Sequence, residues 1–419
     1  MAYQPNHSVH LANTKIIEIN GQRIADVSVN VRLQLIPSPT VIIETDALPR
    51  QVFGNKKFDI VLAGGLRFKA VLRSYTIGKN SGTLMPAHQP VTVIDSKLPL
   101  RTVDFCILNF PPVYGNQEKW IDDGISQRAI PHMRIEVSGW CVEMTGVSNK
   151  QTVEKMLNET QGIDFTYRGQ IKRIDGNDFE VIEVEKLLNG LRVFLSFARG
   201  AWCSFVSVKG KEENDHVSWI HWGAHYVTPW KSNNVSWLIP VGGDNTLSDL
   251  FPTFWKIFTS KGWEEYLFRA IDWYLISNES AVHVGIILTQ AALERLASQV
   301  LCRSKERGEN TGEFIRCAFQ ELNLDTQIPD CCNELKDFQQ THNCEDGLHA
   351  LVKLRNDLIH ANVKHHPDVF PPTYLEAWNL GQWFIEMLLL KIIKYQGKCY
   401  NRLSTMYNHE ESIITVSPN

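Results

Sequence analysis

Three side chains near the end of a helical stretch have the types and spacing to act on a phosphodiester. They are Arg355, Asn356 and His360, in the pattern R-N-x-x-x-H. A histidine can take or give a proton near neutral pH. An arginine presents a planar, always charged fork to phosphate oxygens, and an asparagine can hold an imidazole or a phosphate oxygen. This combination fits attack by a ribose 2′-OH on the adjacent phosphate, with no metal and no covalent intermediate.

The sequence around these residues predicts the helix that must carry them. Apolar residues recur there at three- and four-residue spacings, as on a buried helix face: Leu348, Leu351, Val352, Leu354, Leu358 and Ile359. Residues four apart differ by about 40° around a helix, so Asn356 and His360 should share one stripe. Arg355 falls inside the apolar arc, where an arginine needs an anionic partner, either a carboxylate or a phosphate.

A carboxylate partner for Arg355 is predicted on the stretch 279–301. This stretch is apolar nearly all round, so it should form the central buried helix of its region. Its polar residues fall on one narrow stripe: His283, Gln290, Glu294 and Ser298. If the stripe faces the motif helix, Glu294 meets Arg355, holds it in place and tunes His360. The alternative is that the stripe is the solvent face of the helix.

The motif also has a purely structural interpretation. An arginine and a histidine near the C-terminus of a surface helix interact favourably with the helix dipole and need no further role. The feature that separates the two interpretations is whether Arg355 and His360 from two chains converge on an open cleft.

The motif and its helical surroundings, over roughly residues 250–405, resemble the HEPN superfamily of ribonucleases, which carry an R-x(4–6)-H motif. Arg355, Asn356 and His360 match that motif with a four-residue spacer. The resemblance implies a small helical bundle whose two copies build one RNase site, and therefore a homodimer. His360 would be the acid and base, Arg355 would stabilise phosphate charge and Asn356 would orient them. A β-rich region before such a bundle is similar to ApeA-type anti-phage proteins, which implies defence by abortive infection.

Residues 1–245 are predicted to form a β-rich sensing or regulatory domain. Apolar residues alternate with polar ones at Val27, Val29, Val31, Leu33 and Leu35, as in a half-buried strand. Many short strands punctuated by Pro and Gly are typical of a sandwich or barrel. One helix is predicted near residues 178–199. The helical domain then covers residues 246–405, and residues 406–419 are predicted to be a flexible tail.

Two groups of cations are candidates for RNA contact: Arg67, Lys69 and Arg73 on one predicted strand, and Arg168, Lys172 and Arg173 on another. They either solvate an exposed face or follow RNA phosphates. Because the formal net charge is −4, any RNA contact must use a local patch of this kind.

Five of the twelve tryptophans fall between residues 202 and 237: Trp202, Trp219, Trp222, Trp230 and Trp237. They form either a core with cross-strand pairs or a surface that stacks on bases or sugars. The second interpretation predicts exposed aromatic side chains in a groove. It gives a further competing hypothesis, a carbohydrate or nucleotide sensor centred on these strands. The β-rich domain is also predicted to receive a phage-derived or nucleotide trigger.

The remaining features predict a cytoplasmic protein. The nine cysteines lack the spacing of metal or disulfide sites, so we expect reduced thiols, no metal site and no cofactor. The first residues contain no apolar segment, so no signal peptide is expected. The longest apolar stretch is short and is interrupted by Glu386 and Lys391, so no membrane span is expected.

The sequence therefore predicts an α+β multidomain protein, with a β-rich N-terminal domain followed by an all-α HEPN bundle. Its expected activity is metal-independent endoribonuclease cleavage of RNA in anti-phage defence, giving 2′,3′-cyclic phosphate and 5′-OH ends. The competing hypothesis is a non-catalytic ligand- or RNA-binding protein in which the helical bundle only dimerises.

Overall fold

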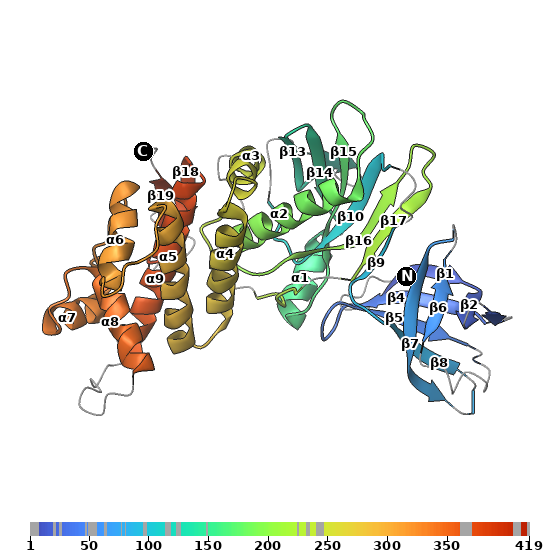
Figure 1. Ribbon diagram of the computed structural model, residues 1–419, viewed down its shortest axis with the longest axis horizontal. Coiled ribbons are helices and arrows are strands. Elements are labelled where there is room, and N and C mark those ends of the chain that lie inside the picture. Colours follow the sequence, from blue (N-terminus) through green and yellow to red (C-terminus); the bar gives the residue numbers. More distant parts are fainter. Residues whose placement is uncertain are drawn as a thin grey trace. The chain divides into compact units, whose positions relative to one another are not determined.

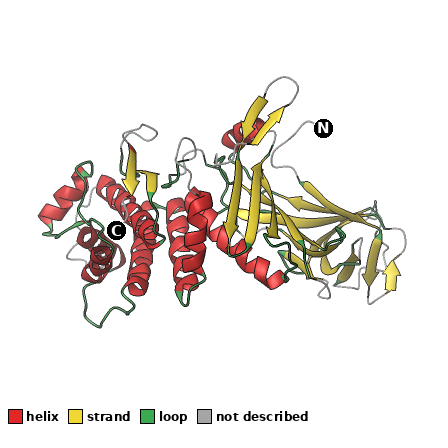
Figure 2. Ribbon diagram, turned by 90° about the horizontal axis from the view of Figure 1, so that it is seen from above, coloured by secondary structure: helices red, strands yellow, loops and turns green. Residues whose placement is uncertain are grey.

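The computed structural model is mixed α+β, with strands in the N-terminal half and helices in the C-terminal part, as the sequence predicts (Figure 2). It describes residues 8–416 except 20–21, 25–26, 47, 49–56, 63–64, 77, 80, 95–98, 114–118, 123–126, 148–149, 224–225, 232–234, 240–246, 361–370 and 405–411. The chain divides into two compact units. The first comprises residues 1–192 and 203–232, and the second comprises residues 193–202 and 233–419.

An eight-stranded antiparallel sheet forms the first part of the N-terminal unit. Its strands are β1 (Val9–Thr14), β2 (Ile16–Ile19), β3 (Gln22–Ile24), β4 (Val29–Gln34), β5 (Thr40–Thr45), β6 (Phe58–Val61), β7 (Arg67–Thr76) and β8 (Ser81–Pro86). Their order is β1-β4-β5-β8-β7-β6-β2-β3, and the sheet is drawn in blue in Figure 1. Val29, Val31 and Leu33 are fully buried, so the alternation seen in the sequence marks the core face of β4.

A seven-stranded antiparallel sheet follows in the order β13-β14-β15-β10-β16-β17-β9. These strands are β9 (Val91–Ile94), β10 (Thr102–Leu108), β13 (His132–Val137), β14 (Trp140–Gly146), β15 (Phe165–Arg173), β16 (Ser204–Lys211) and β17 (Val217–Trp222). A separate hairpin pairs β11 (Lys119–Asp122) with β12 (Gln127–Ile130). One apolar core runs through both large sheets, where the rings of Phe68 and Trp222 meet edge to face at 6.3 Å.

Two helices accompany the strands. Helix α1 (Lys150–Thr160) was not predicted, and helix α2 (Val181–Arg199) confirms the helix expected near residues 178–199. The last turns of α2 belong to the second unit. The ring of Phe194 packs 5.3 Å from that of Phe251, and the ring of Phe197 packs 5.4 Å from that of Trp237.

The C-terminal unit is built from seven further helices in the described residues. They are α3 (Leu247–Phe258), α4 (Trp263–Glu279), α5 (Val282–Val300), α6 (Thr311–Glu321), α7 (Asn333–Thr341), α8 (Gly347–Ile359) and α9 (Pro371–Ile392). Helices α4 and α5 form an antiparallel hairpin, and α5 also packs on α8 and α9 (Figure 1).

The end of the chain corrects one prediction. Residues 406–419 were expected to be a flexible tail, but Ile413–Val416 form strand β19, which pairs with β18 (Gly397–Tyr400). The reason is that the β-branched run Ile413–Val416 favours a strand and completes its backbone hydrogen bonds with Gly397–Tyr400. A flexible tail is therefore wrong for this part of the segment.

Candidate active site at the end of helix α8

Helix α8 carries the R-N-x-x-x-H motif in its last turns. Its first turn is capped by Asp346, whose carboxylate accepts the backbone N–H of His349 at 2.9 Å. Leu348, Leu351 and Leu354 are fully buried or nearly so, and the apolar spacing of the sequence therefore marks the face that fixes the helix in the bundle.

Arg355 and Asn356 lie side by side on this helix, and both are half-buried. The guanidinium Nη1 of Arg355 donates to the side-chain oxygen of Asn356 at 3.1 Å. The Nε of Arg355 is buried and has no partner among the described residues. A buried N–H without a partner is costly, so this guanidinium has unused capacity for an anionic group.

The position of His360 corrects a prediction. Asn356 and His360 were expected to share one helical stripe, but α8 ends at Ile359 and His360 has extended backbone, with φ −95° and ψ 102°. Its backbone N–H still donates to the carbonyl of Asn356 at 2.9 Å. His360 is exposed, and its ring makes no hydrogen bond to a described residue. The rotation of about 100° per residue along a helix therefore does not apply to His360 and does not predict the direction of its imidazole.

The packing of α5, α8 and α9 sets which residues lie level with the motif. A Cβ placed on Gly381 of α9 would meet both Thr289 of α5 and Leu351 of α8, so these two lie at one level. Gly347 of α8 faces Leu380 and Phe384, whereas Gly285 of α5 faces Trp378. Helix α9 is therefore antiparallel to α8 and parallel to α5.

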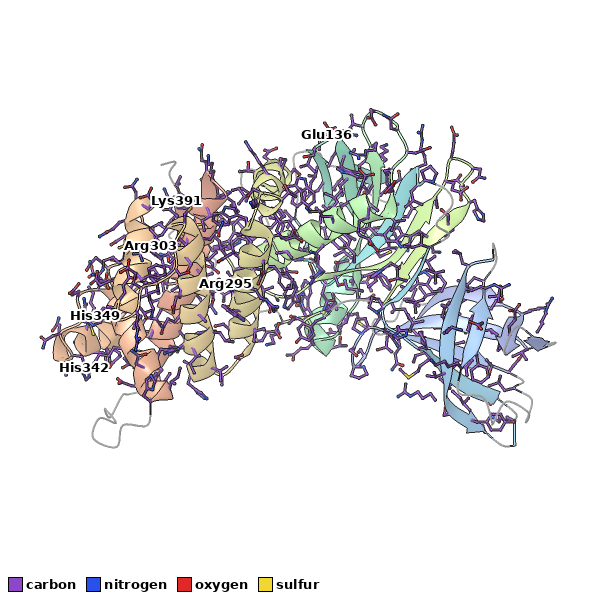
Figure 3. All side chains as sticks on the ribbon, viewed as in Figure 1. Glu136, Arg295, Arg303, His342, His349 and Lys391 are labelled. Atoms are coloured by element: carbon purple, nitrogen blue, oxygen red, sulfur yellow. The ribbon has the colours of Figure 1, made fainter. Side chains whose placement is uncertain are left out.

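This register overturns the predicted pairing of Glu294 with Arg355. Arg355 lies four residues beyond Leu351, toward the start of α5, and Glu294 lies five residues beyond Thr289 in the opposite direction. At 1.5 Å per residue, the two are separated by about 13 Å along the helices. Glu294 instead has its carboxylate 3.7 Å from the amine of Lys305. The next residue, Arg295 (labelled in Figure 3), pairs with Glu265 of α4 at 2.8 Å.

The polar stripe predicted on α5 is divided between different surroundings. Gln290 is 3% exposed and its carbonyl oxygen has no partner among the described residues, whereas His283 is exposed. Ser298 donates to the backbone carbonyl of Glu294 at 3.1 Å. The stripe is thus neither a uniform solvent face nor a partner for the motif.

Exposed apolar residues gather at the motif end of the helical unit. Four large apolar side chains in the described part of this unit are 39–46% exposed: Ile276, Val284, Ile359 and Leu375. They come from the end of α4, the start of α5, the end of α8 and the start of α9, which the register brings to the same end. The sequence gives no sign of this, because each residue fits the apolar pattern of its own helix.

Two further groups accompany the motif at this end. Burial raises the pKa of the Tyr374 hydroxyl, and the nearby carboxylate of Asp357 raises it further. Tyr374 is therefore kept as a hydrogen-bond donor beside the motif. Sequence reasoning missed it because α8 and α9 approach each other only through the antiparallel packing just described.

The two predicted cation groups are not equivalent. In the first group, Arg67 pairs with Glu18 at 2.7 Å and Lys69 with Asp59 at 3.3 Å, whereas Arg73 is exposed without an ion pair to a described residue. In the second group, Arg173 pairs with Glu183 at 2.6 Å.

Arg173 also lies over the ring of Trp140, with its guanidinium carbon 4.0 Å from the ring centroid. Arg168 and Lys172 are exposed and have no ion pair within the described chain. Three of the six cations are thus neutralised locally, which weakens the case for phosphate contact at those positions.

The tryptophans belong mainly to the core. Trp202, Trp219, Trp222 and Trp237 are 1–3% exposed. Trp230 is half-buried, and its indole N–H donates to Asn158 at 2.7 Å. A groove of exposed tryptophans is therefore not found in this cluster, and the core interpretation is confirmed for four of its five members.

The described residues show neither a metal site nor a membrane-spanning helix. They contain no group of three or more His, Cys, Asp or Glu side chains arranged to hold a metal ion. None of their helices combines the length and apolarity needed to cross a membrane.

Comparison with known proteins relates the chain to a family defined by two domain models. Residues 95–233 match the model described as YopA central domain, and residues 260–412 match the model described as YopA C-terminal domain. The second match contains the whole motif. The chain is also similar to the "SPbeta prophage-derived uncharacterized protein YopA" of Bacillus subtilis (strain 168). The two are 26% identical over 364 residues, which cover 82% of this chain and 78% of the relative. No solved structure matches the chain.

Proposed function

We propose that this chain is a metal-independent endoribonuclease of the HEPN type, with Arg355, Asn356 and His360 as its catalytic residues. The observation that carries the proposal is the contact between the Arg355 guanidinium and Asn356, which leaves the buried Nε of Arg355 without a partner in the described chain. A phosphate is one of the two anions that sequence reasoning assigned to this position. The other, the Glu294 carboxylate, pairs with Lys305.

In the proposed reaction, His360 removes the proton of a ribose 2′-OH, which attacks the adjacent phosphorus. His360 then gives that proton to the leaving 5′-oxygen, and the products are a 2′,3′-cyclic phosphate and a 5′-OH. Arg355 stabilises the charge that grows on the phosphate oxygens. Asn356 holds the guanidinium in position through the hydrogen bond described above.

The active form is proposed to be a homodimer. Ile276, Val284, Ile359 and Leu375 expose apolar surface at the end of the bundle where the motif lies. An exposed apolar patch is typical of protein–protein interfaces, and we propose that these four residues form one. Two copies that meet there would bring two R-N-x-x-x-H sets into one RNA site, in a cytoplasmic protein. The similar Bacillus subtilis protein is described as prophage-derived, and we propose a role in anti-phage defence with a trigger at the β-rich unit.

A second candidate function is a non-catalytic ligand- or RNA-binding protein whose helices only dimerise. The exposed His360, with no ring hydrogen bond to a described residue, favours it. In that case the motif helix would serve dimerisation, and loss of the imidazole would change nothing measurable in RNA.

The test is RNA integrity in cells that express the wild type, Arg355→Ala or His360→Ala, with and without phage challenge. Arg307→Ala and His216→Ala are matched controls, because both side chains are exposed in the described structure. We expect fragments with 5′-OH ends and phage protection for the wild type and both controls only. Purified protein should cleave RNA in excess chelator. If folded Arg355→Ala and His360→Ala cut RNA like the wild type, the proposal is wrong.

A further inference from the structure

Two adjacent cysteines lie in the turn before helix α7, outside the motif region. The Sγ atoms of Cys331 and Cys332 are 4.0 Å apart, and both thiols are free. Cys331 is exposed, whereas Cys332 is 4% exposed and stands at the N-cap of α7. Solvent therefore reaches the thiol of Cys331, whereas packing holds the side chain of Cys332 in place.

The distance between the two sulfurs allows both of them to bind one metal ion. Thiolates bind soft ions at about 2.3 Å. Two sulfurs 4.0 Å apart can both lie at that distance from one ion when the S–metal–S angle is about 120°. A disulfide needs the sulfurs at about 2.05 Å, and so would have to draw them together by roughly 2 Å. The arrangement thus allows an ion to bridge the two sulfurs without moving either of them.

We propose that Cys331 and Cys332 form a two-thiolate site for a soft ion of low coordination number, for which Cu⁺ is the biological example. Thiolates select soft ions. The described residues supply no third His, Cys, Asp or Glu ligand, and an ion of low coordination number needs none. The third position is left to solvent or to a small thiol.

Binding replaces protons and one hydrogen bond. The thiol of Cys331 donates to the carbonyl of Leu403 at 3.3 Å. Burial, the neighbouring Cys331 and Glu376 raise the pKa of Cys332, and Lys336 lowers it, with a net value of about 12. Uptake of one Cu⁺ breaks two S–H bonds, forms two S–Cu bonds and releases two protons to the solvent, without a change of oxidation state. The affinity must therefore rise with pH.

The first experiment is an anaerobic titration of the reduced full-length protein with Cu⁺ against a chromophoric Cu⁺ chelator. We expect one ion per chain for the wild type and for Cys302→Ser, which removes an exposed single thiol of the same unit. Cys331→Ser and Cys332→Ser should bind at least tenfold more weakly. Equal binding by wild type and a folded Cys331→Ser protein would overturn the proposal, as would loss of binding in Cys302→Ser.

A pH series and a second probe complete the test. Two released protons predict about a 100-fold rise in the association constant between pH 6.5 and pH 7.5, whereas a single-thiol site predicts about tenfold. Phenylarsine oxide, which forms two As–S bonds with loss of water, should add once to the wild type. It should not add to Cys331→Ser, which changes only an exposed side chain. A tenfold pH dependence, or addition to Cys331→Ser, would contradict the site whether or not the protein cleaves RNA.

Discussion

Arg355 donates a hydrogen bond to the side chain of its own neighbour, Asn356, at 3.1 Å. Consecutive residues on a helix point about 100° apart, so this contact bends the arginine around the helix surface. The guanidinium therefore lies beside the side chain of Asn356 on the surface of α8.

Asn356→Ala should reduce RNA cleavage by about 10- to 1,000-fold, the range for loss of one preorganised polar contact. Asn356→Asp should retain more activity, because it keeps the oxygen that accepts from Arg355. Single-turnover cleavage of a labelled RNA measures both. Glu294→Gln is the control and should cleave like the wild type, since its partner is Lys305. Equal activity of Asn356→Ala and wild type would remove Asn356 from the site.

Ile359→Asp and Leu375→Asp should each shift the protein from dimer to monomer in analytical ultracentrifugation. A charge in an apolar contact must be desolvated without a partner, which weakens association by at least tenfold. Ile182→Asp is the matched control, because Ile182 is the most exposed large apolar residue of the described chain, at 67%, and lies outside the helical unit. If only the control dissociates, the dimer uses another surface.

Arg402→Met should destabilise the helical unit by about 3–5 kcal/mol, because it leaves the buried carboxylate of Glu386 uncompensated. The two groups form an ion pair of 2.7 Å, with side chains only 2% and 0% exposed. Urea unfolding followed by tryptophan fluorescence measures the change. Arg303→Met removes the exposed pair with Glu309 and should cost far less, because solvent screens an exposed pair. Similar losses for both variants would contradict the special role of the buried pair.

The stability contributed by Asp346 should disappear in acid. Burial raises the pKa of its carboxyl, but hydrogen bonds from Arg316 and from the His349 backbone more than offset this, so the folded-state pKa lies below the ordinary value. The contribution, about 1–2 kcal/mol, is therefore present above the unfolded pKa near 4 and is lost as pH falls through the lower folded pKa. Urea midpoints of the wild type and Asp346→Asn should differ at pH 6 and converge toward pH 3. A constant difference would exclude this linkage.

Local patterns in the sequence predict elements but not their neighbours. The alternation from Val27 to Leu35 identifies β4 and its buried face, and apolar spacing identifies α2. No local pattern shows that β9 pairs with β17, where Thr92 lies opposite His221. Such pairing depends on loop geometry and on the fit of distant side chains.

The candidate site divides in the same way. Helical spacing correctly places Arg355 and Asn356 on one helix. Helical spacing gives the angle of Glu294 around α5, but it does not give the level of Glu294 along the helix axis relative to Arg355. That level depends on how the helices pack, and Gly285 and Gly381 are the points where they approach closely. Helical spacing also does not show that α8 ends at Ile359, since the backbone N–H of His360 still donates to the carbonyl of Asn356.

The end of α8 at Ile359 has a consequence for latency. In the proposed ribonuclease, the arginine is held by a helix, whereas the general base lies one residue beyond it and must be ordered before it can work. Fixing such a side chain costs on the order of 1 kcal/mol, and each further kilocalorie of misalignment lowers the active fraction about fivefold, since 1.4 kcal/mol corresponds to a factor of ten. In such a nuclease, a cost of about 1 kcal/mol lowers the resting rate about fivefold. Its idle rate is set by how rarely one imidazole is aligned, and residues that never touch RNA can tune that rate.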